Sequence, residues 1–262
     1  MTASDRLRPP PTALEWNLLV EPQGRSGPEN MALDEGLLLE ADRTGRALLR
    51  LYCWDPPCLS FGRNEPAASR YARAEIERRG LAVVRRPTGG RAVWHEHEVT
   101  YAVAAPVAAF GSLRESYRAI HARLAAALRA LGVDATLASD RPAVRPSDRQ
   151  GACFSTAVGG EVVVNGHKVI GSAQVRRGTA FLQHGSILLD GSQDVVRDVS
   201  GERGAGSSGT TLREHLGRPV RFEEVAEAIV QQWSESVTFA APYRPLPPLT
   251  ARFSDPAWTW RR

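Results

Sequence analysis

Apolar residues recur every three or four positions in several stretches of the chain, which is the spacing of amphipathic helices. The clearest stretch begins at Leu113 and is followed by Gly132, a residue that commonly ends a helix. Another begins near Asn30, which we expect to cap it, and a surface helix is expected to end at Gly80. The predicted helices therefore span residues 30–40, 69–79, 113–131 and 222–233.

Other stretches are rich in β-branched and aromatic residues and are bounded by Gly, Pro and Asn. They predict strands at 47–54, 58–61, 81–84, 99–104 and 179–189, the last of them broken by Gly185. Asn165-Gly166 separates two apolar runs and predicts a type I′ hairpin in which Val163 faces Lys168. Lys168 then lies on the mostly apolar side of the hairpin, with Val163 and Ile170.

Strands mixed with a few helices, with hairpins among them, predict an α+β fold, that is a mixed-sheet α/β domain and not a doubly wound parallel sheet. We expect residues 30–240 to form this domain. Residues 1–29 are predicted to be a partly flexible N-terminal segment, and residues 241–262 an extended, Pro-rich tail. Residues 134–151 and 201–209 are expected to be mostly loops.

Composition excludes several classes of protein. The 262 residues are 42% hydrophobic, which is enough for a sizeable core, but no run approaches the roughly 18 to 20 apolar residues of a membrane span. The net charge of +4 is spread along the chain, which does not favour nucleic-acid binding. Three irregularly spaced cysteines do not make a disulfide framework. We expect a cytoplasmic protein that binds neither membranes nor nucleic acid.

Lys168 is the one lysine among 33 basic residues, the other 32 being Arg. A desolvated ammonium can lose its proton near neutrality, whereas a guanidinium cannot. Cys153, fifteen residues earlier, lies on a polar, glycine-flanked segment, whereas Cys53 and Cys58 lie in strand-like surroundings typical of buried cysteines. A cation beside Cys153 would favour its thiolate, the form that attacks a thioester. The ammonium could then protonate the departing thiol, and the free amine could deprotonate a second nucleophile. Such a pair can transfer an acyl group in two halves.

Gly89-Gly90 follows Arg85-Arg86 in a predicted turn. Glycine lets a ligand approach the backbone closely, and guanidinium groups nearby could hold a polar or anionic group. The spacing matches neither the dinucleotide fingerprint nor the phosphate-binding loop.

His95 and His97 lie two residues apart on a predicted strand, with Glu96 and Glu98 facing the other way. This spacing allows two ligands to share a metal, but only His184 offers a third. We therefore expect no metal site.

Four motifs occur in the order found in a known family: an opening helix, an Arg-Arg to Gly-Gly loop ending in His, a lysine strand and a His-Gly strand. They read Asn30-Met31-Ala32-Leu33-Asp34-Glu35, Arg85-Arg86-Pro87-Thr88-Gly89-Gly90-Arg91-Ala92-Val93-Trp94-His95, Lys168-Val169-Ile170-Gly171-Ser172-Ala173-Gln174 and Gln183-His184-Gly185-Ser186-Ile187-Leu188. Together they resemble the biotin/lipoate A/B protein ligase family, and within it the octanoyltransferases that use a cysteine. Glu96 departs from the family's usual Asp, and residues 155–160 replace a bulkier stretch that contains Pro and aromatic residues.

The resemblance implies a mixed β-sheet flanked by helices and an octanoyltransferase that needs neither metal nor nucleotide. Cys153 would carry the acyl thioester, and Lys168 would lower its pKa and move protons. The donor would be octanoyl-acyl carrier protein, and the acceptor a lysine of a lipoyl domain, such as that of the glycine cleavage H protein or an E2 subunit. We expect a monomer. Substrate binding would fall to Arg86, Thr88, Gly89, Gly90, Arg91, His95, Gly171, Ser172, Ala173, His184, Gly185 and Ser186.

Three alternatives stay open. The ATP-dependent lipoate ligases of the same family share the Arg-Gly-Gly, lysine and His-Gly motifs and would require ATP and Mg²⁺. Cys153-Phe154 and Arg91 favour the transferases, because the ligases more often have a third glycine at the position of Arg91. An amidotransferase that moves octanoyl from H protein to E2 would also use a cysteine. A protein that binds acylated carriers without turnover is the non-enzymatic alternative.

Overall fold

The computed structural model describes residues 14–138, 159–200, 209–233, 237–239 and 243–261, and the remaining residues lie outside this description. The helices are α1 (Gly27–Thr44), α2 (Ala67–Arg70), α3 (Arg73–Arg78), α4 (Leu113–Ala130), α5 (Asp194–Ser200), α6 (Leu212–Leu216), α7 (Phe222–Gln231), α8 (Pro247–Ser254) and α9 (Pro256–Thr259), with a 3₁₀ turn at Val107–Ala109. The strands are β1 (Trp16–Arg25), β2 (Ala47–Trp54), β3 (Cys58–Phe61), β4 (Ala82–Arg85), β5 (Val93–His95), β6 (Glu98–Pro106), β7 (Ala135–Leu137), β8 (Val162–Val164), β9 (His167–Lys168), β10 (Ile170–Arg177), β11 (Ala180–Leu188) and β12 (Val237–Phe239).

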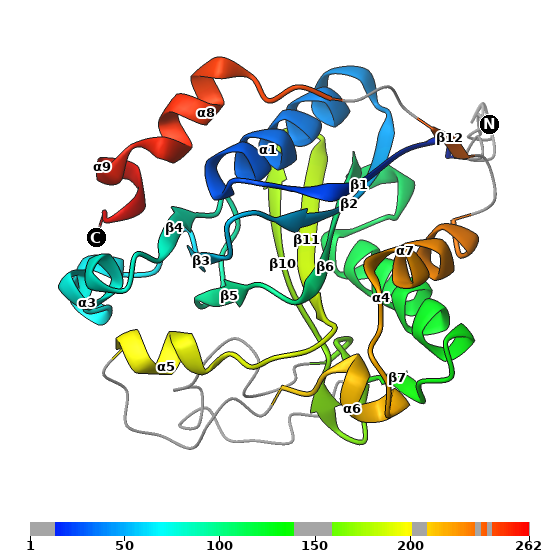
Figure 1. The fold of residues 1–262 in the computed structure, drawn as a ribbon. Helices are drawn as coiled ribbons and strands as arrows, with labels where there is room; N and C mark the ends of the chain where they lie inside the picture. Colours follow the sequence, from blue (N-terminus) through cyan, green and yellow to red (C-terminus); the bar gives the residue numbers. More distant parts are fainter. Residues whose placement is uncertain (1–13, 139–158, 201–208, 234–236, 240–242, 262) are drawn as a thin grey trace, which may run out of the picture.

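A mixed sheet in the order β10-β11-β6-β2-β1-β12 forms the centre of the fold. β1 runs parallel to β2 and β12, and the other pairs are antiparallel. The helices α1 and α8 cover one face of this sheet, and α4 and α7 cover the other (Figure 1). Two three-stranded sheets, β4-β3-β5 and β7-β8-β9, adjoin it in the described residues. The predicted mixed-sheet fold is confirmed.

Alternation along β2 explains why the sheet is covered on both faces. Leu49 and Leu51 pack with the α4 and α7 side, whereas Leu48 and Tyr52 pack with the α1 and α8 side. Successive side chains of a strand point to opposite faces, so a strand with apolar residues on both sides must be buried on both. The prediction of this strand at residues 47–54 is confirmed.

The long amphipathic helix is confirmed as α4, with Ser112 accepting a hydrogen bond from the Glu115 backbone as its cap. Helix α1 begins earlier than predicted, with Ser26 as its N-cap and Pro at the start of its first turn. The prediction of Asn30 as the cap is therefore wrong. Its amide lies inside the helix and donates to the carbonyl oxygens of Arg25 and Cys53.

Three further predictions are corrected. A single surface helix over 69–79 is wrong: the chain forms α2 and α3, separated where the Ala72 N–H leaves the helix to bond the Val199 carbonyl oxygen at 2.7 Å. Gly185 does not break its strand, since β11 pairs continuously with β6 and β10. The predicted extended tail instead forms α8 and α9.

Both ends of the described chain contribute to the domain. Residues 16–25 of the N-terminal segment form β1 within the central sheet, Ser26 is the N-cap of α1, and residues 27–29 form its first turn. At the other end, the Arg85 guanidinium donates to carbonyl oxygens of Trp258, Thr259 and Arg261. The same group donates to the carbonyl oxygens of Gly62, Arg63 and Glu65. Arg85 thus joins the C-terminal helices to the turn after β3.

No helix in the residues that the structure describes is both long and apolar enough to cross a membrane.

Candidate active site

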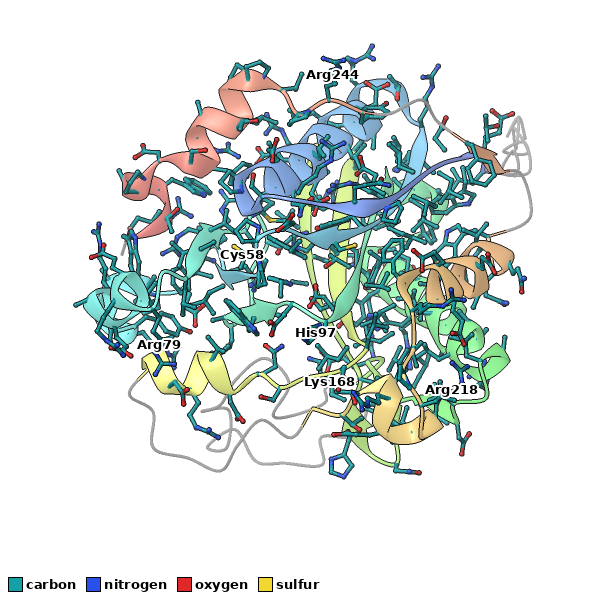
Figure 2. All side chains as sticks on the ribbon, in the orientation of Figure 1. Cys58, Arg79, His97, Lys168, Arg218 and Arg244 are labelled. Carbon is teal, nitrogen blue, oxygen red and sulfur yellow. The ribbon has the colours of Figure 1, made fainter. Side chains whose placement is uncertain are left out.

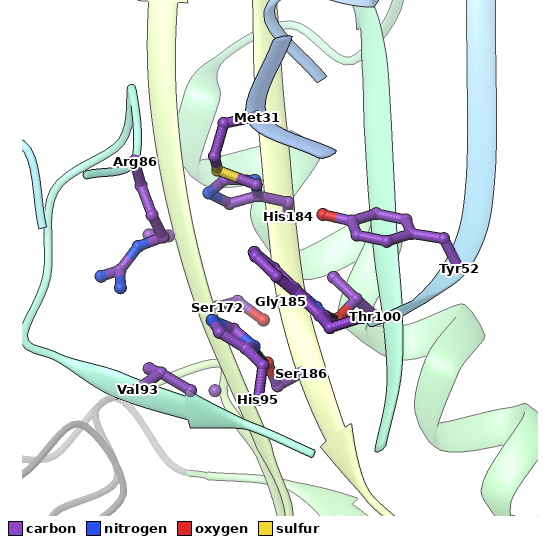
Figure 3. Close-up of a pocket in the computed structure, with 13 residues that line it drawn as sticks. Met31, Tyr52, Arg86, Val93, His95, Thr100, Ser172, His184, Gly185 and Ser186 are labelled. Carbon is purple, nitrogen blue, oxygen red and sulfur yellow. Dashed lines mark hydrogen bonds between the residues drawn. The ribbon is translucent and has the colours of Figure 1, made fainter. Parts of the chain in front are cut away.

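A pocket opens between α1, β5 and the strands β2, β6, β10 and β11 of the central sheet (Figure 3). Its empty volume, part of which is open solvent, is about 330 Å³. Its lining is formed by Met31, Tyr52, Trp54, Arg86, Val93, His95, Thr100, Gly171, Ser172, Ala173, His184, Gly185 and Ser186.

Eight of the predicted binding residues line this pocket: Arg86, His95, Gly171, Ser172, Ala173, His184, Gly185 and Ser186. The other four, Thr88, Gly89, Gly90 and Arg91, belong to the adjoining loop and do not line it. The sequence analysis missed the lining residues Met31, Tyr52, Trp54, Val93 and Thr100. Their apolar or β-branched side chains fit the periodicity of their elements and look like ordinary core. Residues of all four motifs thus line the pocket, the opening helix contributing Met31, and Tyr52, Trp54 and Thr100 of the central sheet complete the lining.

Gly185 is required where β10 and β11 approach the pocket. A Cβ added there would lie 2.5 Å from both the Gly171 carbonyl oxygen and the Ser172 Oγ, and 2.9 Å from the Tyr101 ring. Such distances are far inside van der Waals contact. The glycine therefore serves close packing of two strands at the pocket.

His95 is held between two side chains at the end of β5. Its Nδ1 lies 2.8 Å from Glu98 Oε1 and its Nε2 lies 2.6 Å from Ser60 Oγ. The Arg86 guanidinium donates to the same hydroxyl at 2.7 Å, and the indole of Trp54 stacks on the imidazole with ring centroids 4.0 Å apart. Glu98 therefore contacts His95 directly. The prediction that Glu98 faces away from His95 along one strand is wrong, because a turn separates β5 from β6.

His184 forms a second chain of hydrogen bonds, which anchors the Gly-Gly loop. Its Nδ1 lies 2.8 Å from Asp34 Oδ2, and its Nε2 lies 2.6 Å from Thr88 Oγ1. Burial lowers the pKa of His184, so the ring is neutral, donates to Asp34 and accepts from Thr88. Burial alone would raise the pKa of Asp34, but the hydrogen bond from His184 and the charge of Arg50 bring it below its usual value. Asp34 is thus a carboxylate that fixes the histidine tautomer.

His121 of α4 reaches the pocket wall from the opposite face of the sheet. Its Nδ1 donates to the Gly160 carbonyl oxygen at 2.7 Å, and its Nε2 lies 2.8 Å from Ser172 Oγ. Tyr101 Oη lies 2.7 Å from the same Oγ, and Gln183 donates to the tyrosine at 2.8 Å. Burial lowers the pKa of His121 to about 4, so the neutral ring accepts at Nε2. This network links Ser172 in the pocket to Gly160.

The two arginines before the Gly-Gly loop donate hydrogen bonds to backbone carbonyl groups of the protein itself. Besides the carbonyl contacts of Arg85, Arg86 donates to the carbonyl oxygens of Ser60, Gly89 and Arg91 at 2.8–3.0 Å. Both side chains are buried. The guanidinium groups therefore hold the loop in shape. Arg86 also lines the pocket, and its role in binding substrate stays a prediction.

Lys168 lies at the lower end of the central sheet near α6 (Figure 2), where the Thr210 N–H bonds its carbonyl oxygen. The predicted register is confirmed, with Val163 opposite Lys168 and positive φ angles at Asn165 and Gly166. The Lys168 side chain is 4% exposed, and its Nζ donates to Glu161 Oε1 at 2.7 Å. The sequence analysis missed Glu161. Because residues two apart in a strand share a face, Glu161, Val163 and Lys168 lie on the same side of the hairpin.

Cys153 lies outside the described residues, so its distance from Lys168 is not described and the proposed pairing stays a prediction. The other two cysteines are placed. Burial raises the pKa of Cys53 to about 11 and also raises that of Cys58, so both thiols stay protonated near neutrality.

Among the described residues, no group of three or more His, Cys, Asp or Glu side chains is arranged to hold a metal ion. His95 is buried, whereas the side chain of His97 is 59% exposed. The structure thus separates the two histidines that sequence spacing had suggested as joint ligands.

Comparison with solved structures identifies the class of fold to which this chain belongs. A lipoate-protein ligase A bound with ATP matches with a TM-score of 0.77 at 19% identity, over 94% of this chain and 99% of that one. The bi-partite lipoate protein ligase of Thermoplasma acidophilum, studied with its E2 lipoyl domain, matches with a TM-score of 0.71 at 21% identity, over 94% and 96%. The fold is that of lipoate-protein ligase catalytic domains.

The chain belongs to the lipoyl protein ligase A/B catalytic domain family, whose model matches residues 26–234. Among its relatives, the octanoyltransferase LipM of Kyrpidia tusciae is 40% identical over 243 residues, covering 85% of this chain and 87% of that protein. The octanoyltransferase LipM of Carboxydothermus hydrogenoformans is 44% identical over 228 residues, covering 80% and 82%. The family predicted from the four motifs is confirmed.

Proposed function

We propose that this chain is an octanoyltransferase of protein lipoylation that works through a cysteine thioester. The main support is its similarity, over most of its length, to octanoyltransferases at 33–44% identity. A second support is the pocket, whose apolar residues Met31, Trp54 and Val93 suit an alkyl chain. The reaction transfers an acyl group from a donor to a lipoyl-domain acceptor. We further propose octanoyl-acyl carrier protein as donor and the glycine cleavage H protein or an E2 subunit as acceptor.

In the first half of the reaction, the Cys153 thiolate attacks the carbonyl carbon of the octanoyl thioester. Backbone N–H groups near Gly90 or on the strand of Lys168 would stabilise the oxyanion. The new C–S bond forms on Cys153, the C–S bond to the carrier breaks, and the Lys168 ammonium gives its proton to the departing carrier thiol.

In the second half, the amine of the acceptor lysine attacks the thioester on Cys153. A C–N bond forms, the C–S bond to Cys153 breaks, and Lys168 takes the proton that the amine loses. The enzyme returns to its thiolate and ammonium form. These two reaction steps need no nucleotide or metal, and they suit a monomer in the cytoplasm.

Intact-mass spectrometry tests the nucleophile directly. Incubation with octanoyl-acyl carrier protein should add one octanoyl group to the wild type and to Cys53→Ala, and none to Cys153→Ala. Equal labelling of Cys153→Ala would end the claim. Lys168→Arg keeps the charge but cannot release a proton, so transfer to the acceptor should fall at least about tenfold; near-normal transfer would contradict the proton-moving role.

Different donors offered with the same acceptor domain distinguish the alternatives. A ligase would modify it with free lipoate and ATP, and Cys153→Ala would hardly affect that reaction. An amidotransferase would use octanoyl-H protein as donor and leave octanoyl-acyl carrier protein unused. A carrier-binding protein would show no acyl-enzyme with any donor.

A further inference from the structure

Lys168 is buried with a carboxylate beside it. Glu161 Oε1 lies 2.7 Å from Lys168 Nζ, and each side chain is only 4% exposed. A charge removed from water to this extent is costly unless an opposite charge and hydrogen bonds compensate it. Glu161 and Lys168 therefore form a buried ion pair of the hairpin and not a solvent-exposed one.

Several contacts fix the position of Glu161. The Gly160 carbonyl oxygen accepts from His121, and the Gly160 N–H bonds the Ala138 carbonyl oxygen at 2.9 Å. The Ala138 N–H in turn bonds the Glu161 carbonyl oxygen at 2.7 Å, and the Tyr117 hydroxyl donates to Glu161 Oε1 at 3.3 Å. These backbone hydrogen bonds and the bond from the Tyr117 hydroxyl therefore fix the Glu161 carboxylate beside Lys168.

Other charged or titratable groups face this pair from the packed elements. Helix α4 contributes Tyr117 and His121, and the side chain of Arg118 lies against Gly160. Strand β6 contributes Tyr101, whose pKa is raised mainly by burial and also by the charge of Glu161. Near neutrality the histidine and the two tyrosines are uncharged. Glu161 is therefore the group whose charge most directly stabilises an ammonium at Lys168.

We propose that Glu161 is a positioning residue for Lys168: its carboxylate orients Nζ and holds Lys168 as an ammonium, so that Lys168 favours the Cys153 thiolate and later retakes a proton. This inference rests on the proposed function for its catalytic part. The placement itself does not, because the ion pair is present whether or not the chain transfers octanoyl groups.

The solitary lysine allows a test in the full-length protein. Labelling with ¹³C,¹⁵N-lysine yields one set of side-chain NMR signals, and the Nζ signal reports the charge of Lys168 across a pH titration. In Glu161→Gln the pH midpoint of this signal should fall by at least about one unit relative to wild type, because an adjacent opposite charge is worth about 1 to 3 units. Glu161→Asp, which keeps the carboxylate, should restore much of the difference. Glu227→Gln, which alters an exposed glutamate of α7, is the matched control and should leave the midpoint in place.

The catalytic consequence is read from single-turnover acylation by octanoyl-acyl carrier protein followed by mass spectrometry. The alkaline limb of the pH-rate profile should move down with the NMR midpoint, so that acylation by Glu161→Gln at the wild-type midpoint falls at least about fivefold, with Glu161→Asp between the two. A profile and a midpoint that stay at the wild-type values in folded Glu161→Gln would overturn the proposal.

A second variant covers the case in which Glu161→Gln does not fold. Glu161→Ala also removes the carboxylate and should lower the lysine midpoint as Glu161→Gln would, whereas Tyr117→Phe, which removes the hydroxyl that bonds Glu161, should shift it less. An unchanged midpoint in Glu161→Ala contradicts the proposal. If instead the wild type forms no acyl-enzyme while its lysine midpoint still responds to Glu161→Ala, the proposed function fails and the ion-pair inference survives.

Discussion

His121 makes the stability of this protein depend on pH in a way that can be calculated. The ring is buried and neutral, and burial lowers its pKa to about 4 in the folded chain, against the 6.5 of an ordinary histidine. Between these values the unfolded chain binds a proton that the folded chain does not. The contribution of His121 to the free energy of unfolding is therefore fully present above pH 6.5 and is lost as the pH drops toward 4. Two and a half pKa units correspond to about 3 kcal/mol, a large part of the 5 to 15 kcal/mol of a typical domain.

Substitutions that cannot titrate should remove this dependence. His121→Asn can place an amide near Nδ1 and keep the bond to Gly160, whereas His121→Gln can place one near Nε2 and keep the bond to Ser172. Both should be less stable than wild type at pH 7.5 because one hydrogen bond is lost, by about 1 to 3 kcal/mol. Between pH 7.5 and 4.5, however, each should lose about 2 to 3 kcal/mol less than the wild type.

Urea unfolding at several pH values measures both effects. His97→Gln, which removes an exposed histidine, is the matched control and should follow the wild-type curve. Titration of shared groups such as Asp34 cancels in the difference between wild type and variant. If the wild-type and His121 curves run parallel from pH 7.5 to 4.5, the assignment of a neutral, buried His121 is wrong.

Two further substitutions test the packing around the site. Gly185→Ala should destabilise the protein by about 2 kcal/mol in urea unfolding, since its Cβ meets the Gly171 carbonyl oxygen; Gly36→Ala, in an open part of α1, should instead stabilise it by about 0.5 to 1 kcal/mol. Arg85→Lys should speed hydrogen exchange in α8 and α9, because a single ammonium cannot reach the carbonyl groups that Arg85 bonds. Arg79→Lys on the surface should leave that exchange unchanged, and equal exchange in both variants would contradict the joining role of Arg85.

Elements defined by local pattern could be predicted from the sequence. The apolar stripe of α4 and the Asn165-Gly166 hairpin carry their signals within a few residues, and both were predicted with the correct register or extent. The break between α2 and α3 carries no such signal. It depends on the bond from Ala72 to Val199, a contact between residues far apart in the sequence that only the folded chain provides.

The candidate site was predictable in part. Motif residues such as Ser172 and His184 could be named because their pattern occurs in a known family. Lining residues outside the motifs, such as Tyr52 and Trp54, could not, since nothing in their spacing distinguishes a pocket wall from core. Glu161 stands between these cases. The predicted hairpin register already placed it on the same face as Lys168, but a carboxylate next to an apolar strand reads as solvent-exposed until its burial is known.

The histidines around the pocket leave proton transfer to other groups. His95 has partners at both ring nitrogens, Glu98 and Ser60, and His184 has Asp34 and Thr88. His121 is likewise bonded at both nitrogens, and with a pKa of about 4 it is a weak base near neutrality. A histidine with both nitrogens bonded within the protein must break a buried hydrogen bond before it can exchange a proton with a substrate. Proton movement in the proposed reaction is therefore better assigned to Lys168, whose ammonium carries three protons and donates to Glu161 Oε1 at 2.7 Å.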